Sequence, residues 1–74
     1  MSETGLKRIR GELGLTEEAM AKRLTVSYST YRNAEKGKPC RYATAMEILG
    51  VINGIRAERG MPPVSLEDLG LNIQ

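Results

Sequence analysis

The stretch LTEEAMAKRLTVSYSTYRNAEKGK, residues 15–38, decides the fold that the sequence predicts. Its first part carries the signals of a helix start. Thr16 can accept a hydrogen bond from a free backbone amide of the first turn, and Glu17 and Glu18 place negative charge beside the positive end of the helix dipole. We therefore expect a helix that begins near Thr16.

A second helix is expected after a three-residue break. Thr25, Val26 and Ser27 interrupt the helical pattern, and Ser27 can cap a helix that runs to Lys36. Gly37 can adopt the left-handed conformation that ends many helices. Two short helices joined by a tight turn form a helix-turn-helix motif.

The second helix has two different faces. Its apolar side is expected to point inward, with Tyr31, Ala34 and one edge of Thr30. The other side carries hydrogen-bonding, cationic and aromatic groups that suit base edges and phosphates, namely Tyr28, Ser29, Arg32, Asn33 and Lys36. A polar, basic face is also common on helices that bind nothing, so this face alone leaves both interpretations open.

Residues 15–38 resemble the helix-turn-helix of phage-repressor and Cro-type regulators, the XRE-like family. The agreement lies in cap, small, apolar and glycine positions: Leu15, Thr16, Ala21, Leu24, Val26, Ser27, Ser29, Thr30, Glu35, Gly37 and Lys38. The resemblance implies an all-α fold, a compact bundle of about five helices similar to lambda repressor. It also implies that the helix 27–36 enters the major groove and contacts bases through Tyr28, Ser29, Arg32 and Asn33.

The same resemblance implies further roles for single residues. Contacts to the DNA backbone are expected from Thr16, Lys22, Ser27, Lys36, Lys38 and Arg41. An ion pair between Arg10 and Glu35 is expected to join the first helix to the end of the recognition helix, the alternative being two unrelated surface charges.

The chain departs from the family pattern at two positions that matter for function. Glu17 stands where the family often has a glutamine that bonds a phosphate, and its charge would repel one. Thr25 stands where the turn usually carries glycine, so we expect a β-branched residue in a backbone conformation that it disfavours.

Length and charge fit one small domain, residues 1–74, with a basic half. The core has no Phe or Trp to use, so its stability is expected to be modest and a partner subunit would help. Residues 1–41 hold nine Lys or Arg and five acids, whereas residues 42–74 hold two and four. Within residues 22–41 there are six basic residues and one acid, a concentration that suits a phosphate backbone or, alternatively, only a solvated surface.

Composition also argues against several classes of protein. One cysteine and no histidine exclude an intramolecular disulfide and leave no catalytic triad or metal-ligand cluster, so we expect no enzyme, no metal and no cofactor. There is no signal peptide and no run of about 18 apolar residues that would span a membrane. A cytoplasmic protein is therefore expected.

The flanking segments are predicted to be helical as well. Leu6, Ile9 and Leu13 indicate a helix over 6–13 capped by Ser2 or Thr4. Apolar residues at spacings of three and four predict a long helix over 42–59, and a short helical turn follows Ser65, with Asp68 completing a capping box. Residues 42–74 are expected to form the dimer interface through Val51, Ile55, Leu66 and Leu69.

The sequence therefore predicts a sequence-specific, DNA-binding transcriptional regulator, a dimeric repressor that binds double-stranded DNA and has no membrane partner. A protein partner such as a toxin or an anti-repressor is a further possibility. The alternative function is an interaction module or antitoxin-like partner that keeps the fold with little or no DNA binding; Glu17 and the wide apolar face of the helix 42–59 favour it.

Overall fold

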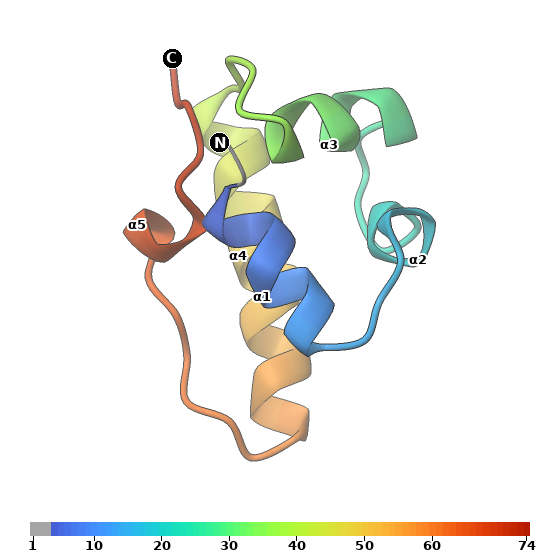
Figure 1. Ribbon diagram of the computed structural model, residues 1–74, viewed down its shortest axis with the longest axis vertical. Helices are drawn as coiled ribbons and strands as arrows, with labels where there is room; N and C mark the ends of the chain where they lie inside the picture. The colour runs from blue at the N-terminus through green and yellow to red at the C-terminus, as the bar shows by residue number, and fades with distance from the viewer. Residues whose placement is uncertain (1–3) are drawn as a thin grey trace.

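The computed structural model describes residues 4–74 and contains five α-helices (Figure 1). They are α1 (Gly5–Glu12), α2 (Glu17–Ala21), α3 (Tyr28–Glu35), α4 (Tyr42–Glu58) and α5 (Leu66–Leu69). The described residues form no β-strand, only one isolated parallel bridge between Cys40 and Ile73. The all-α fold that the sequence predicted is confirmed.

Side-chain caps explain where four of the helices begin. Thr4, Thr16, Ser27 and Ser65 each accept a hydrogen bond from the backbone amide three residues ahead. In turn, Asp68 Oδ2 accepts a hydrogen bond from the backbone N–H of Ser65, so the predicted capping box is present. Ser2, the other candidate cap for α1, lies outside the described residues.

The core is one cluster of buried side chains to which every helix contributes. In Figure 1, α4 is the long central helix seen behind α1, with α5 on one side and α2 and α3 on the other. The apolar residues that are most deeply buried come from every helix: Leu6, Ile9, Leu13, Met20, Tyr31, Ala34, Ala45, Ile48, Ile52, Ile55 and Leu69. Tyr31 is the largest of them and is fully buried.

Two of the four residues predicted for the dimer interface lie in the core. Leu69 is fully buried and Ile55 is only 5% exposed, because α5 packs against both α1 and α4 and turns these side chains toward the protomer's own core. Neither residue has enough surface left to form a dimer contact. Val51 and Leu66 are half-buried, so both keep some exposed surface.

The helices α1 and α5 approach each other through glycine. A Cβ placed on Gly5 would lie 1.9 Å from the backbone oxygen of Asp68, far inside van der Waals contact. Gly70 ends α5 in the left-handed conformation, with φ of 62°, close to the backbone of Gly5. The first turn of α1 therefore fits against α5 only because Gly5 has no side chain.

Side chains of α4 hold the segment that leads to α5. Asn53 bonds both backbone groups of Val64, accepting from its N–H at 2.8 Å and donating to its oxygen at 3.0 Å. Arg56 is buried and donates from Nε to the backbone oxygen of Pro62 at 2.7 Å. These bonds fix the path of residues 60–65 and hence the position of the C-terminal residues.

Candidate nucleic-acid interface

The two faces of α3 are separated as the sequence predicted, with one exception. Tyr31 and Ala34 are fully buried, whereas Tyr28, Ser29, Arg32 and Asn33 are exposed. Thr30, which was expected to turn one edge inward, is exposed too. The four candidate base-contacting residues thus share an open surface, and Thr30 belongs to the same surface.

The turn before α3 is tied to the middle of α4. The backbone N–H of Thr25 donates to Glu47 Oε2 at 2.7 Å, and its hydroxyl donates to Glu47 Oε1 at 3.0 Å. No non-glycine residue among those described has a positive φ, so the expectation of a disfavoured backbone at Thr25 is wrong. Glu47 thus accepts hydrogen bonds from both the N–H and the hydroxyl of Thr25, and these bonds link the turn before α3 to α4.

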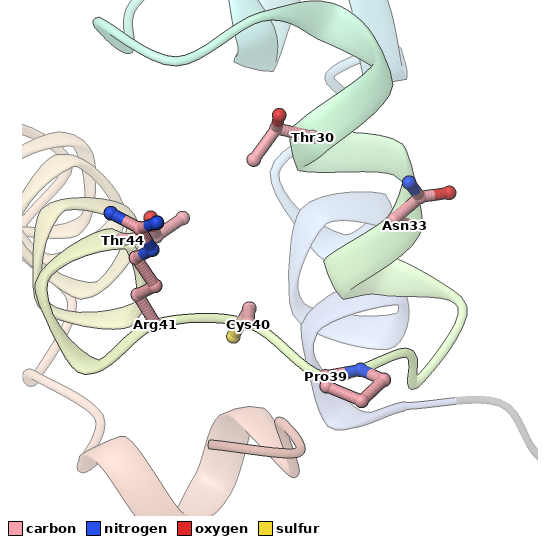
Figure 2. A pocket seen from close by; sticks show the side chains of 6 residues that line it. All are labelled: Thr30, Asn33, Pro39, Cys40, Arg41 and Thr44. Atoms are coloured by element: carbon pink, nitrogen blue, oxygen red, sulfur yellow. The ribbon is translucent and has the colours of Figure 1, made fainter. Parts of the chain in front are cut away.

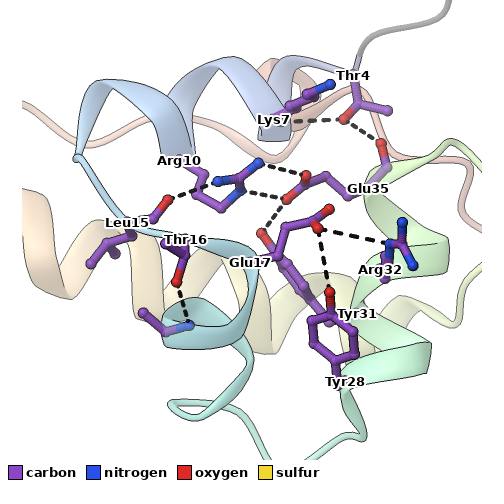
Figure 3. Close-up of polar contacts among 11 residues, drawn as sticks. Thr4, Lys7, Arg10, Leu15, Thr16, Glu17, Tyr28, Tyr31, Arg32 and Glu35 are labelled. Atoms are coloured by element: carbon purple, nitrogen blue, oxygen red, sulfur yellow. Dashed lines mark hydrogen bonds and ion pairs between the residues drawn. The ribbon is translucent and has the colours of Figure 1, made fainter.

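A buried ion pair joins α1 to the end of α3 (Figure 3). Arg10 donates from Nε to Glu35 Oε2 at 2.8 Å and from Nη2 to Oε1 at 2.9 Å, so the pair is bidentate. Arg10 also donates to the backbone oxygen of Leu15 at 2.7 Å, and the Tyr31 hydroxyl donates to Glu35 Oε2 at 2.6 Å. The predicted contact between these two charges is therefore present, at the centre of a larger network.

Protonation in this network is set by burial and by the hydrogen bonds. Burial alone would raise the pKa of the Glu35 carboxyl, but the bonds from Arg10 and Tyr31 outweigh burial and hold that pKa below its ordinary value. The bond to Glu35 raises the pKa of Arg10, and burial raises the pKa of the Tyr31 hydroxyl. At neutral pH the carboxylate is charged and its charge is neutralised inside the protein.

Glu17 lies next to two of the candidate base-contacting residues. Its Oε1 is 3.8 Å from Arg32 Nε and accepts a long hydrogen bond, 3.5 Å, from the hydroxyl of Tyr28 (Figure 3). Both partners are substantially exposed, so this contact is weak and screened by solvent. It nevertheless places one negative charge at the edge of the α3 surface.

The candidate backbone contacts fall into two groups. Lys22, Lys36, Lys38 and Arg41 are exposed. The hydroxyls of Thr16 and Ser27 act as helix caps, and that of Ser27 also donates to the hydroxyl of Thr30 at 3.0 Å. A phosphate contact from Ser27 would therefore have to replace an existing hydrogen bond.

An open pocket of about 250 Å³ lies between α3 and the start of α4 (Figure 2). It is lined by Thr30, Asn33, Pro39, Cys40, Arg41 and Thr44. Arg41 precedes α4 without capping it through its side chain, so the first amides of this 17-residue helix have no side-chain acceptor among residues 4–74. Thr44 is 9% exposed and has no side-chain hydrogen bond within the described part of the chain.

Several of these features had little signal in the sequence. Glu47 bonds to a turn 22 residues away, and Thr44 lines a pocket only through the packing of α3 against the start of α4; neither belongs to a local motif. Pro39 is a local signal that a helix cannot continue, and the structure has a loop there between α3 and α4.

Other kinds of site have no support in residues 4–74. No group of three or more potential metal-ligating side chains occurs there. None of the helices in that range has the length and hydrophobicity that a membrane span requires.

Comparison with known proteins identifies one family. A family model described as helix-turn-helix matches residues 6–53, from α1 into the second half of α4. Neither the curated proteins nor the solved structures include a match to the chain.

Proposed function

Because the chain belongs to the XRE-like helix-turn-helix family of DNA-binding transcription regulators, we propose that it is a sequence-specific repressor that acts in the cytoplasm as a homodimer. In this proposal α3 enters the major groove of double-stranded DNA. Arg32 suits a bidentate contact to guanine and Asn33 one to adenine, with Tyr28 and Ser29 beside them.

The observation that carries this proposal is the division of α3 into two faces. Tyr31, Ala34 and the Glu35 carboxylate hold the helix to the core, while the four candidate base-contacting side chains project from it into solvent. A helix held rigidly on one side and polar on the other matches the requirements of major-groove recognition.

The charges around α3 support contacts to phosphates. Glu35 is the one acid in residues 22–41, and it is buried and paired with Arg10, so it does not offset the positive surface. The first amides of α4, together with Arg41 and the Thr44 hydroxyl, offer donors around one pocket. Such donors at a helix start favour an anion, which in this proposal is a DNA phosphate.

The proposed dimer would use the half-buried Val51 and Leu66. Two-fold symmetry would then place two copies of α3 in successive major grooves, about 34 Å apart. The operator would have the symmetry of the dimer.

Selection of duplexes from a random pool tests the proposal directly. We expect an enriched site with two-fold symmetry, bound by two chains, because both half-sites are read by the same helix. The affinity for this site, measured at several salt concentrations, should fall by about 0.9 in log K per log unit of salt for each phosphate contact.

Two variants distinguish sequence-specific base contacts from nonspecific electrostatic attraction to DNA. Asn33→Ala should lose about 1–3 kcal/mol of discrimination at one base pair. Arg8→Gln removes an exposed charge from α1, away from α3, and should leave the preferred sequence unchanged. Binding with no enriched sequence, and with equal losses in both variants, would contradict sequence-specific recognition.

A second candidate function is an interaction module, similar to an antitoxin that binds a toxin or a regulator that binds an anti-repressor. The position of Glu17 favours it, because the carboxylate contacts Arg32 and would repel a phosphate at the start of α2. The exposed Met46 and Tyr42 on α4 add apolar surface for a protein partner.

Glu17→Gln distinguishes the two functions. If α2 lies against the DNA backbone, the loss of one nearby negative charge removes about 1 kcal/mol of repulsion, so affinity for the selected duplex should rise about fivefold at low salt. Glu18→Gln is the matched control, because it removes an exposed acid from the same helix turn without the contact to Arg32. An equal response of both variants, measured by fluorescence anisotropy, would argue against a phosphate beside Glu17.

A further inference from the structure

The C-terminal segment, residues 71–74, lies against the loop that connects α3 to α4. The N–H of Cys40 donates to the backbone oxygen of Asn72 at 2.9 Å, and the N–H of Gln74 donates to the backbone oxygen of Cys40 at 3.0 Å. These two bonds form the parallel bridge between Cys40 and Ile73. The side chain of Asn72 adds a long bond, 3.5 Å, to the backbone oxygen of Gly37.

The loop has few other backbone hydrogen bonds. On the α3 side, the last is from the N–H of Lys38 to the oxygen of Asn33, at 3.0 Å. On the α4 side, the oxygen of Arg41 accepts the first helical bond, from Ala45. Pro39 has no N–H to donate. Among the described residues, the backbone of 39–40 is therefore bonded only to the C-terminal segment.

This bonded point lies between two exposed cations. Lys38 and Arg41 flank Pro39 and Cys40, and the side chain of Cys40 is buried. With its side chain in the core and both backbone groups bonded, Cys40 has a fixed orientation. The directions in which Lys38 and Arg41 leave the loop are fixed with it.

From this arrangement we infer that residues 72–74 act as a clamp that positions Lys38 and Arg41 to contact DNA phosphates. The inference rests on the proposed function and adds a role for a segment outside the helix-turn-helix. A loop already ordered in the free protein loses less conformational entropy when it binds, so the clamp raises affinity without touching the DNA.

Two substitutions at one position test the clamp. Gln74→Pro removes the N–H that bonds Cys40, and proline favours an extended conformation for the residue before it. Gln74→Ala is the matched control, because it removes the same side chain, including its bond to Asn72, and keeps the N–H. The two variants therefore differ in whether residue 74 has the N–H that donates to the backbone oxygen of Cys40.

We expect Gln74→Pro to bind the selected duplex about tenfold more weakly than Gln74→Ala at low salt. The slope of log K against log salt should be shallower by about 1–2, since each lost phosphate contact accounts for about 0.9. The preferred bases should be unchanged, because α3 is not altered. In a background with Lys38→Gln and Arg41→Gln, the difference between the two variants should disappear.

The outcomes separate this inference from the proposed function. Equal affinities and equal salt slopes for Gln74→Pro and Gln74→Ala would overturn the clamp and leave the proposed function intact. Absence of selective DNA binding by the unaltered protein would overturn both. Circular dichroism at the assay temperature shows whether each variant is folded; if Gln74→Pro is unfolded, a chain ending at Ile73 lacks the same N–H and is used in its place.

Discussion

Arg10→Met is expected to lower the free energy of unfolding by about 3–5 kcal/mol, which is enough to unfold most molecules of a domain this small. The Glu35 side chain is 2% exposed, and without Arg10 its charge would lose the cation that neutralises it and keep the hydrogen bond from the Tyr31 hydroxyl. The backbone oxygen of Leu15 would lose a donor as well. Urea unfolding followed by circular dichroism measures the loss.

The double variant Arg10→Met with Glu35→Leu provides the control. It removes both charges, so no uncompensated carboxylate stays in the core, and we expect it to recover more than half of the lost stability. A loss below about 1 kcal/mol in Arg10→Met would show that Glu35 finds solvent or another partner, and that the network is not essential for the fold.

The pH dependence of the unaltered protein follows from the same carboxyl group. The pKa of Glu35 is lower in the folded protein than its ordinary value, so the stability that this group provides is present at neutral pH. It should be lost as the pH falls below about 4.3 and through the folded-state value. In Arg10→Met the ion pair is gone, so burial disfavours the charged form of Glu35. The unaltered protein therefore loses more stability in acid than the variant does, and the difference between their free energies of unfolding should become smaller as the pH falls.

Gly5→Ala is expected to destabilise the fold by about 3 kcal/mol, although alanine is the better helix former. The new methyl group would lie 1.9 Å from the backbone oxygen of Asp68, and a backbone atom cannot move aside as a flexible side chain can. The helices α1 and α5 would have to separate. Thermal unfolding of the variant measures the cost.

Gly11→Ala is the matched control in the same helix. Nothing lies within 4 Å of the position where its Cβ would be, so the gain in helix propensity should stabilise the protein by about 0.5–1 kcal/mol. Equal effects of the two substitutions would mean that α5 does not rest on α1 in solution.

Local signals in the sequence were enough to predict most helix boundaries. Thr16 and Ser27 cap the helices that they were expected to cap, Ser65 and Asp68 form the expected capping box, and Gly37 ends α3 with φ of 88°. Each of these signals acts within four residues, so it can be seen without knowledge of the fold.

Partners that are distant in the sequence could not be predicted in the same way. The ion pair of Arg10 with Glu35 came from the family resemblance, and nothing local to either residue indicates it. Leu66 and Leu69 are the same residue type in one helix, yet Leu69 is fully buried and Leu66 only partly. A helix of four residues is too short for periodicity to show which side faces the core.

Because the two faces of α3 are separate, the exposed face can evolve while the buried face stays the same. The residues that hold the helix in place, Tyr31, Ala34 and Glu35, are not those that face the solvent, Ser29, Arg32 and Asn33. Exposed substitutions away from special contacts usually change stability by less than about 0.5 kcal/mol. If α3 reads bases as proposed, new DNA-sequence preferences can therefore arise at the open face by single mutations that leave the scaffold intact, and a randomised library at those positions is a practical way to explore them.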